Sequence, residues 1–180
     1  MVEKGLNKLF LGFIFIMLGF RIQGFDILPD IVGFLFFASG FSNLSPHSDY
    51  FIKAAKYNIP MVILSIFSLY QDLSHGEGLN LGLLGIPLSI ISFVVCLLVV
   101  YYLFMGVKDM AIKKEQLDIA LESNEKWNEY VILQIAVLLT FIMLFIPALA
   151  FIHIFLILII SIIFTIRITG FLKKCSQTLS

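Results

Sequence analysis

One uncharged apolar run constrains the fold of this chain more than any other feature. No residue from Val131 to Ile166 carries a formal charge. As a single α-helix this run would be about 54 Å long at about 1.5 Å per residue, whereas the hydrocarbon core of a bilayer is about 30 Å thick. Pro147 interrupts the run where a turn would divide it into two helices of spanning length. We therefore expect a tight hairpin of two membrane helices.

The composition extends this conclusion to the whole chain. Of its 180 residues, 60% are hydrophobic and only 13% are charged, about half the roughly 25% of a soluble domain. So few polar groups cannot cover a surface that faces water, so lipid must surround most of the protein. The predicted fold class is all-α, a polytopic membrane protein with one transmembrane domain over residues 1–180. Because the charges balance without a basic block, we expect no nucleic-acid partner.

Six segments have the roughly 20 mostly apolar residues that a membrane-spanning helix needs. The predicted helices cover about 6–23, 27–44, 57–73, 81–107, 127–146 and 149–169. With the N-terminus inside, the inner segments hold every lysine and Arg167, and the outer segments hold only Arg21. This excess of inner cations predicts a multi-pass protein of the cell membrane with both termini in the cytoplasm.

The longest polar stretch, residues 108–129, is rich in helix formers and predicts a cytoplasmic helical hairpin. It contains two i,i+4 pairs of opposite charge, Lys114–Asp118 and Glu122–Lys126. Ser123 or Asn124 is the expected break and helix cap. Two interpretations stay open: a solvated hairpin, or a surface that docks a cytoplasmic protein.

Polar side chains gather at three predicted helix ends on the outer side. They are Arg21, Gln23, Asp26 and Asp30 around the first turn, and Gln71, Asp72 and His75 after the third helix. His153 lies at a similar depth in the sixth helix. Ionisable groups near the membrane core are paired and often functional. The cluster therefore predicts a shallow outward-facing vestibule in which Arg21 is held by acids, and these eight residues are the candidate binding site.

The same residues also have a purely structural interpretation. Asp26 can cap the second helix, Pro29 suits its first turn, and Asp30 favours the positive end of its dipole. The Arg21 side chain can reach the headgroups. Both interpretations remain open at this point.

Small residues recur at helical spacing in two predicted helices. Gly5, Gly12 and Gly19 lie seven residues apart in the first, and the fourth carries Gly82, Gly85, Ser89, Ser92 and Cys96. Such stripes let helix backbones approach closely in a membrane. We expect both to serve packing.

The sequence offers little for catalysis or for a metal or cofactor. It has no paired-histidine metal motif, no Gly-x-Ser-x-Gly motif and no Cys-x-x-Cys spacing. His75 with Asp72 and Glu77 is a weak proton-transfer group. We expect a protein that is not an enzyme and that binds no metal or cofactor.

Residues 25–34 (FDILPDIVGF), 39–41 (SGF) and 51–55 (FIKAA) carry a family resemblance. In this first third the chain resembles small multi-pass membrane proteins of Gram-positive bacteria that are described as uncharacterised, which implies a membrane fold but no activity. The size and helix number are also similar to those of the substrate-binding components of energy-coupling-factor vitamin transporters, a likeness of architecture that does not establish function.

Two functions follow as hypotheses. The first is transport, or binding of a ligand or lipid, through the outward-facing polar vestibule. The alternative is a non-catalytic structural or regulatory membrane subunit that acts through helix packing or through its cytoplasmic loop on a membrane or cytoplasmic protein partner.

Overall fold

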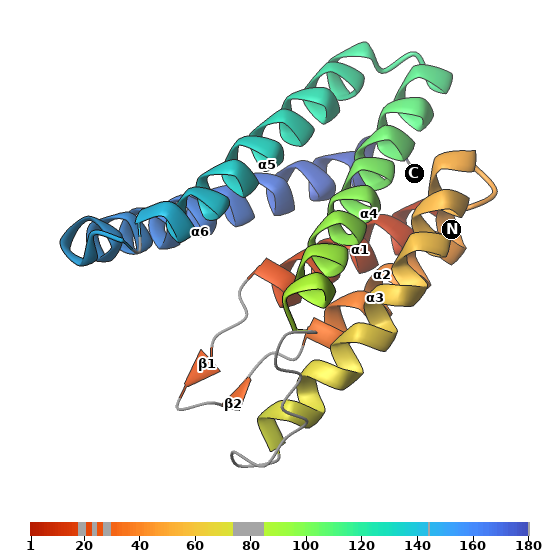
Figure 1. Cartoon of the computed structure of the whole chain (residues 1–180). Helices are drawn as coiled ribbons and strands as arrows, with labels where there is room; N and C mark the ends of the chain where they lie inside the picture. The colour runs from red at the N-terminus through yellow and green to blue at the C-terminus, as the bar shows by residue number, and fades with distance from the viewer. Residues whose placement is uncertain (18–20, 23–24, 27–29, 74–84, 144, 180) are drawn as a thin grey trace.

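The computed structural model describes residues 1–17, 21–22, 25–26, 30–73, 85–143 and 145–179. Within them the chain is all-α apart from one two-stranded antiparallel ladder, and the prediction of an all-α chain with six helices is confirmed (Figure 1). The elements are α1 (Val2–Met17), β1 (Arg21–Ile22), β2 (Phe25–Asp26), α2 (Asp30–Leu44), α3 (Asp49–Leu73), α4 (Gly85–Lys113), α5 (Leu117–Met143) and α6 (Pro147–Thr178).

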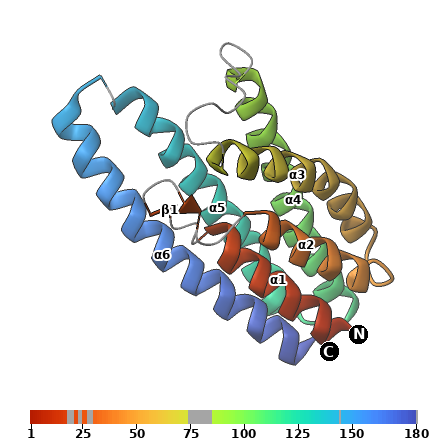
Figure 2. The same ribbon diagram turned by 90° about the horizontal axis from the view of Figure 1, so that it is seen from below.

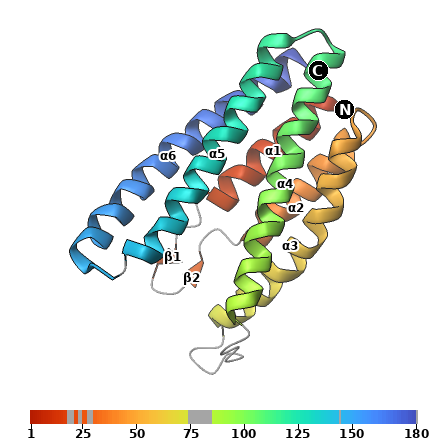
Figure 3. The same ribbon diagram turned by 45° about the horizontal axis from the view of Figure 1, so that its top comes forward.

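The six helices run alternately up and down, so the two termini lie at the same end of the bundle (Figure 3). This end, which we call the terminal end, also carries the α2–α3 and α4–α5 turns. The strands β1 and β2 and the α5–α6 turn lie at the opposite end, which we call the strand end. Helix α6 packs against both α1 and α5 (Figure 2). Consecutive helices are therefore antiparallel, and successive turns lie at opposite ends of the bundle.

Glycines on two facing helices bring α1 and α2 into backbone contact. A Cβ added at Gly12 would lie 2.9 Å from the carbonyl oxygen of Gly33, and one added at Gly33 would lie 3.0 Å from that of Gly12. Gly5 and Gly40 make a similar close approach one step along the helices. The predicted close packing is thus observed for Gly5 and Gly12, and its counterpart is a second seven-residue glycine spacing in α2.

Phenylalanine rings fill the space between four helices. Phe13 of α1 meets Phe37 of α2 edge to face, with ring centroids 5.2 Å apart. Phe104 of α4 contacts both Phe13 and Phe171 of α6, at 6.2 and 6.4 Å. All these rings are buried. Aromatic burial therefore ties α1, α2, α4 and α6 into one core.

The α4–α5 turn falls earlier in the sequence than predicted. Helix α5 is continuous from Leu117, and the break lies just before it, where Glu115 has a φ of 59°. Ser123 is buried and donates a hydrogen bond to the carbonyl oxygen of Phe104 at 2.7 Å. The prediction of a cap at Ser123 or Asn124 was wrong because tertiary contact with α4 overrides the local capping preference.

Other helix bounds also differ from the predictions. Helix α1 ends at Met17 instead of 23, and β1 lies within the range predicted to be helical. Helix α6 begins at Pro147, with Ile146 in an extended conformation before it, and continues to Thr178 instead of ending at 169. Helix α3 begins at Asp49 instead of 57, and Pro60 lies inside it. Hydrophobicity marks where a helix is apolar, and α3 and α6 continue past that point into polar sequence.

Two of the described helices are long and apolar enough to span a membrane: Pro87–Lys113 and Pro147–Thr178, of 27 and 32 residues. Helices α1 and α2 are shorter, with 16 and 15 residues. Helix α6 and the turn before it leave large apolar side chains in contact with solvent, among them Phe145 at 88% and Phe151 at 78% exposure. The sequence predicted six membrane-spanning helices, whereas two of the described helices meet the requirement of length and composition.

Candidate functional site

Backbone pairing places two of the predicted site residues opposite each other. Arg21 of β1 and Asp26 of β2 are partners in the antiparallel ladder, and Ile22 pairs with Phe25. Asp30 begins α2, shortly after this ladder. The first predicted turn is therefore a short hairpin at the strand end, which brings its cation and an acid to adjacent backbone positions.

The other predicted residues of the vestibule are only partly covered by the structure. Gln71 and Asp72 belong to the last turn of α3, and helix α3 contacts β2. Their backbone thus lies at the strand end together with the ladder (Figure 1). Gln23 and His75 lie outside the described residues. The fold consequently gathers five of the eight candidates, counted as Arg21, Asp26, Asp30, Gln71 and Asp72, at one end.

His153 has a different setting from these residues. Its ring nitrogen Nε2 lies 3.0 Å from the carbonyl oxygen of Ala136 in α5. The bond connects the two helices of the α5–α6 hairpin within their apolar region. His153 thus has a structural partner that sequence reasoning did not identify.

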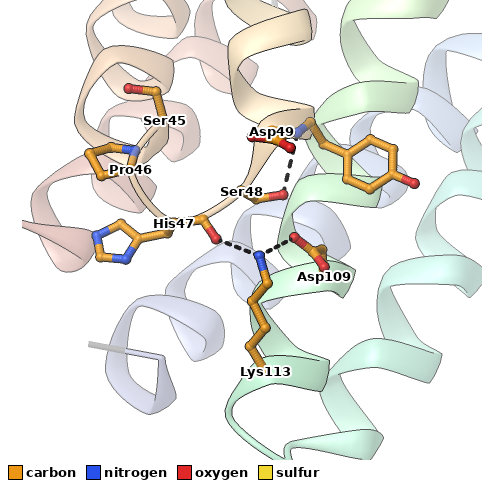
Figure 4. Close-up of a pocket in the computed structure, with 8 residues that line it drawn as sticks. Ser45, Pro46, His47, Ser48, Asp49, Asp109 and Lys113 are labelled. Carbon is orange, nitrogen blue, oxygen red and sulfur yellow. Dashed lines mark hydrogen bonds and ion pairs between the residues drawn. The ribbon is translucent and has the colours of Figure 1, made fainter.

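A polar recess lies at the terminal end, between the α2–α3 turn and α4 (Figure 4). Its volume is about 280 Å³. Lys113 donates to Asp109 Oδ2 at 2.8 Å and to the carbonyl oxygen of His47 at 3.1 Å. The recess is lined by Ser45, Pro46, His47, Ser48, Asp49, Tyr50, Asp109 and Lys113.

The electrostatics of this recess follow from its hydrogen bonds. The Asp109 carboxylate accepts hydrogen bonds from Lys113 and Ser48, which offset the cost of its partial burial. The Ser48 hydroxyl also accepts a hydrogen bond from the backbone N–H of Tyr50 at 3.4 Å, at the start of α3. The recess therefore anchors the α2–α3 turn on α4 through a lysine and a carboxylate that neutralise each other.

A second charged cluster connects α5 and α6. The Lys126 ammonium lies 3.2 Å from Glu129 Oε2, and the Arg167 guanidinium lies 2.8 Å from Glu129 Oε1. The Lys126 side chain is only 5% exposed, whereas that of Arg167 is 56% exposed. We call these three residues the α5–α6 triad. It contains two cations and one anion, so a positive charge remains without an anionic partner inside the triad.

An apolar groove begins at this triad. It has a volume of about 240 Å³ and lies on the surface between α5 and α6. Its lining consists of Glu129, Ile132, Leu133, Ala136, Ile160, Ile163, Phe164 and Arg167. The sequence contained one signal for the cluster, the i,i+3 spacing of Lys126 and Glu129, but no local pattern brings Arg167 to Glu129.

The remaining contacts at the terminal end fasten α6 to the α4–α5 hairpin. Glu122, expected to pair with Lys126, instead accepts a hydrogen bond from Lys174 at 2.7 Å. Lys114 donates to the carbonyl oxygen of Leu179 at 2.7 Å. These contacts explain why α6 stays helical beyond its apolar segment.

Among the described residues, no group of three or more His, Cys, Asp or Glu side chains is arranged to hold a metal ion. Comparison with protein-family models, with curated proteins and with solved structures gives no match. Any function therefore has to be argued from the residues of this chain alone.

Proposed function

We propose that the chain is a multi-pass protein of the cell membrane in which all six helices cross the bilayer. Two helices meet the requirement for a span within the described residues. The large apolar side chains that α6 and the turn before it expose, such as Phe151 and Phe145, are favourable next to lipid and unfavourable next to water. Successive turns lie at opposite ends of the bundle (Figure 3), which is the arrangement that six crossings require.

The proposed orientation places the terminal end in the cytoplasm. The cations of the described helix ends and turns gather there: Lys113 and Lys114 at the α4–α5 turn, and Lys173 and Lys174 near the C-terminus. Arg21, in contrast, belongs to the strand end. Cytoplasmic segments of membrane proteins carry an excess of lysine and arginine, so both termini are assigned to the cytoplasm.

The strand end then faces outward, and we assign to it the binding or transport of a small polar ligand. The observation that supports this function is the pairing of Arg21 with Asp26 in the ladder, next to Asp30 and to the last turn of α3 with Gln71 and Asp72. An arginine among carboxylates at the outer membrane surface can bind a ligand that carries a negative and a positive group. The same charged groups could instead line a path for an ion.

Uptake into proteoliposomes tests this function. The purified protein is reconstituted, and a mixture of amino acids, nucleosides, sugars and water-soluble vitamins is applied outside, with mass spectrometry of the vesicle contents. We expect at least one solute to accumulate above protein-free vesicles, and the Arg21→Ala variant to lose that uptake while Lys114→Ala keeps it. Equal contents in vesicles with and without protein, or full uptake by Arg21→Ala, would contradict the proposal.

The polar recess favours a second candidate, a non-catalytic structural or regulatory subunit. The recess opens at the terminal end beside the exposed Lys113 (Figure 4), and a cytoplasmic protein could dock there. In that case a partner co-purifies with the wild-type chain, is lost when the segment from Lys113 to Glu125 is disrupted, and is retained by Arg21→Ala. This pattern is the reverse of the one expected for uptake.

A further inference from the structure

We propose that the groove between α5 and α6 binds an anionic phospholipid of the cytoplasmic leaflet, with the lipid phosphate at Arg167 and an acyl chain along the apolar wall. The inference rests on the membrane placement proposed above. It concerns a different surface from the outer vestibule, and the residues that form it are all described. The groove has a charged end and an apolar length, which is the pattern of a phospholipid.

The geometry of the groove matches one acyl chain. Its two walls run from Glu129 to Ala136 on α5 and from Arg167 back to Ile160 on α6. Seven residues of helix rise about 10 Å, so the groove follows the first half of a chain of ordinary length. Beyond the triad the lining is entirely apolar, and two of its residues, Ile132 and Ile163, are more than half exposed.

The charge balance at the head of the groove selects an anion. Glu129 interacts with both Lys126 and Arg167, so the two cations share a single carboxylate. Lys126 is buried, and its ammonium group forms an ion pair with Glu129 inside the triad. Arg167 is more than half exposed, and its guanidinium has five N–H donors, of which Glu129 engages only part.

A phosphate at Arg167 would use the remaining donors. Arginine binds phosphate through paired N–H···O bonds that are stronger than neutral hydrogen bonds. A phosphatidylcholine headgroup carries its own cation and gains less from the surplus positive charge, whereas phosphatidylglycerol carries only the anion. In the proposed orientation Arg167 lies near the inner interface, at the level where such headgroups occur.

Quenching by brominated lipids measures this preference. The only tryptophan, Trp127, is replaced by phenylalanine, and Ile160→Trp places a reporter on the groove wall; Ile132→Trp on the opposite wall is a second reporter in case the first disturbs packing. The full chain is reconstituted in vesicles in which dibrominated phosphatidylglycerol replaces its unbrominated form, and in parallel vesicles with dibrominated phosphatidylcholine. The measured quantity is the association constant of the first lipid relative to the second.

We expect a preference of about fivefold or more for phosphatidylglycerol, which corresponds to about 1 kcal/mol, and a decrease in 0.5 M salt. Arg167→Gln should reduce the ratio to about one, while Glu129 keeps Lys126 as its partner and the fold is retained. Lys113→Gln, which removes one cation from the same end of the bundle but away from the groove, should leave the preference unchanged.

The outcomes separate the two proposals. If both brominated lipids quench the reporters equally in the wild-type chain, or if Arg167→Gln keeps the preference, the lipid site is wrong while the membrane placement stands. If neither lipid quenches either reporter, the membrane placement itself is overturned, and the lipid site with it.

Discussion

At the residue scale, the contact between Gly12 and Gly33 decides how closely α1 and α2 approach. Each glycine lies against the backbone of the other helix, and Phe37 fills the space beside Gly12. A backbone carbonyl cannot move aside as a flexible side chain can, so a methyl group at this position must push the helices apart.

Gly12→Ala should therefore destabilise the fold by about 1 to 3 kcal/mol, the usual range for an overpacked core. Gly170→Ala in α6 is the matched control, because a Cβ at Gly170 meets nothing within 4 Å and alanine is the better helix former by about 1 kcal/mol. Thermal unfolding in detergent compares the two variants with the wild type. A Gly12→Ala variant as stable as Gly170→Ala would show that α1 and α2 are not in backbone contact.

The contact between α1 and α2 could be predicted from the sequence only in part. The spacing of Gly5 and Gly12 predicted a packing face on the first helix. The partner glycines of α2, Gly33 and Gly40, have the same spacing, yet only the structure shows that the two rows face each other. Residue types indicate a close approach, but which helix approaches depends on tertiary arrangement.

At the element scale, the α5–α6 pair is held by charge at one end. Lys126 is nearly buried, and among the described residues Glu129 is the carboxylate that pairs with it. Removing one partner of a buried ion pair leaves the other charge without compensation, which is more costly than never having had the pair.

Glu129→Gln should destabilise the protein by about 3 to 5 kcal/mol. The control is the same substitution in the same helix, Glu122→Gln, whose partner Lys174 is 53% exposed, so its loss should cost about 0 to 1 kcal/mol. Denaturant titration of both variants in the same detergent compares them. Equal stability losses would mean that Lys126 is not buried in the way described.

Predictions from the sequence about the ends of helices and the contacts between them were partly right and partly wrong. Pro147 correctly marked the division of the apolar run into two helices, although α6 begins at Pro147 itself and not at the predicted 149, because proline suits the first turn of a helix. Ser123 misled, since its hydroxyl bonds to the carbonyl of Phe104 across the bundle and not to its own helix. The polar cluster of the strand end followed from its position between apolar runs, whereas the groove at Arg167 depends on the register of α5 against α6, which no local pattern encodes.

At the scale of the whole molecule, the proposed membrane topology depends on six alternating helices with lysines at one end. The α5–α6 turn is the critical point, because no charged residue marks it in the sequence. Phe145 lies in this turn and is almost fully exposed, and Lys114 lies in the turn at the opposite end of the bundle.

Labelling of single cysteines in intact cells tests this arrangement most directly. In a background where Cys96 and Cys175 are replaced by alanine, Phe145→Cys and Lys114→Cys are treated with a membrane-impermeant maleimide before and after permeabilisation. Six crossings with the termini inside predict that Phe145→Cys reacts with intact cells and that Lys114→Cys reacts only once the membrane is opened. Reaction of Lys114→Cys in intact cells, or protection of Phe145→Cys until permeabilisation, would contradict six crossings with both termini in the cytoplasm.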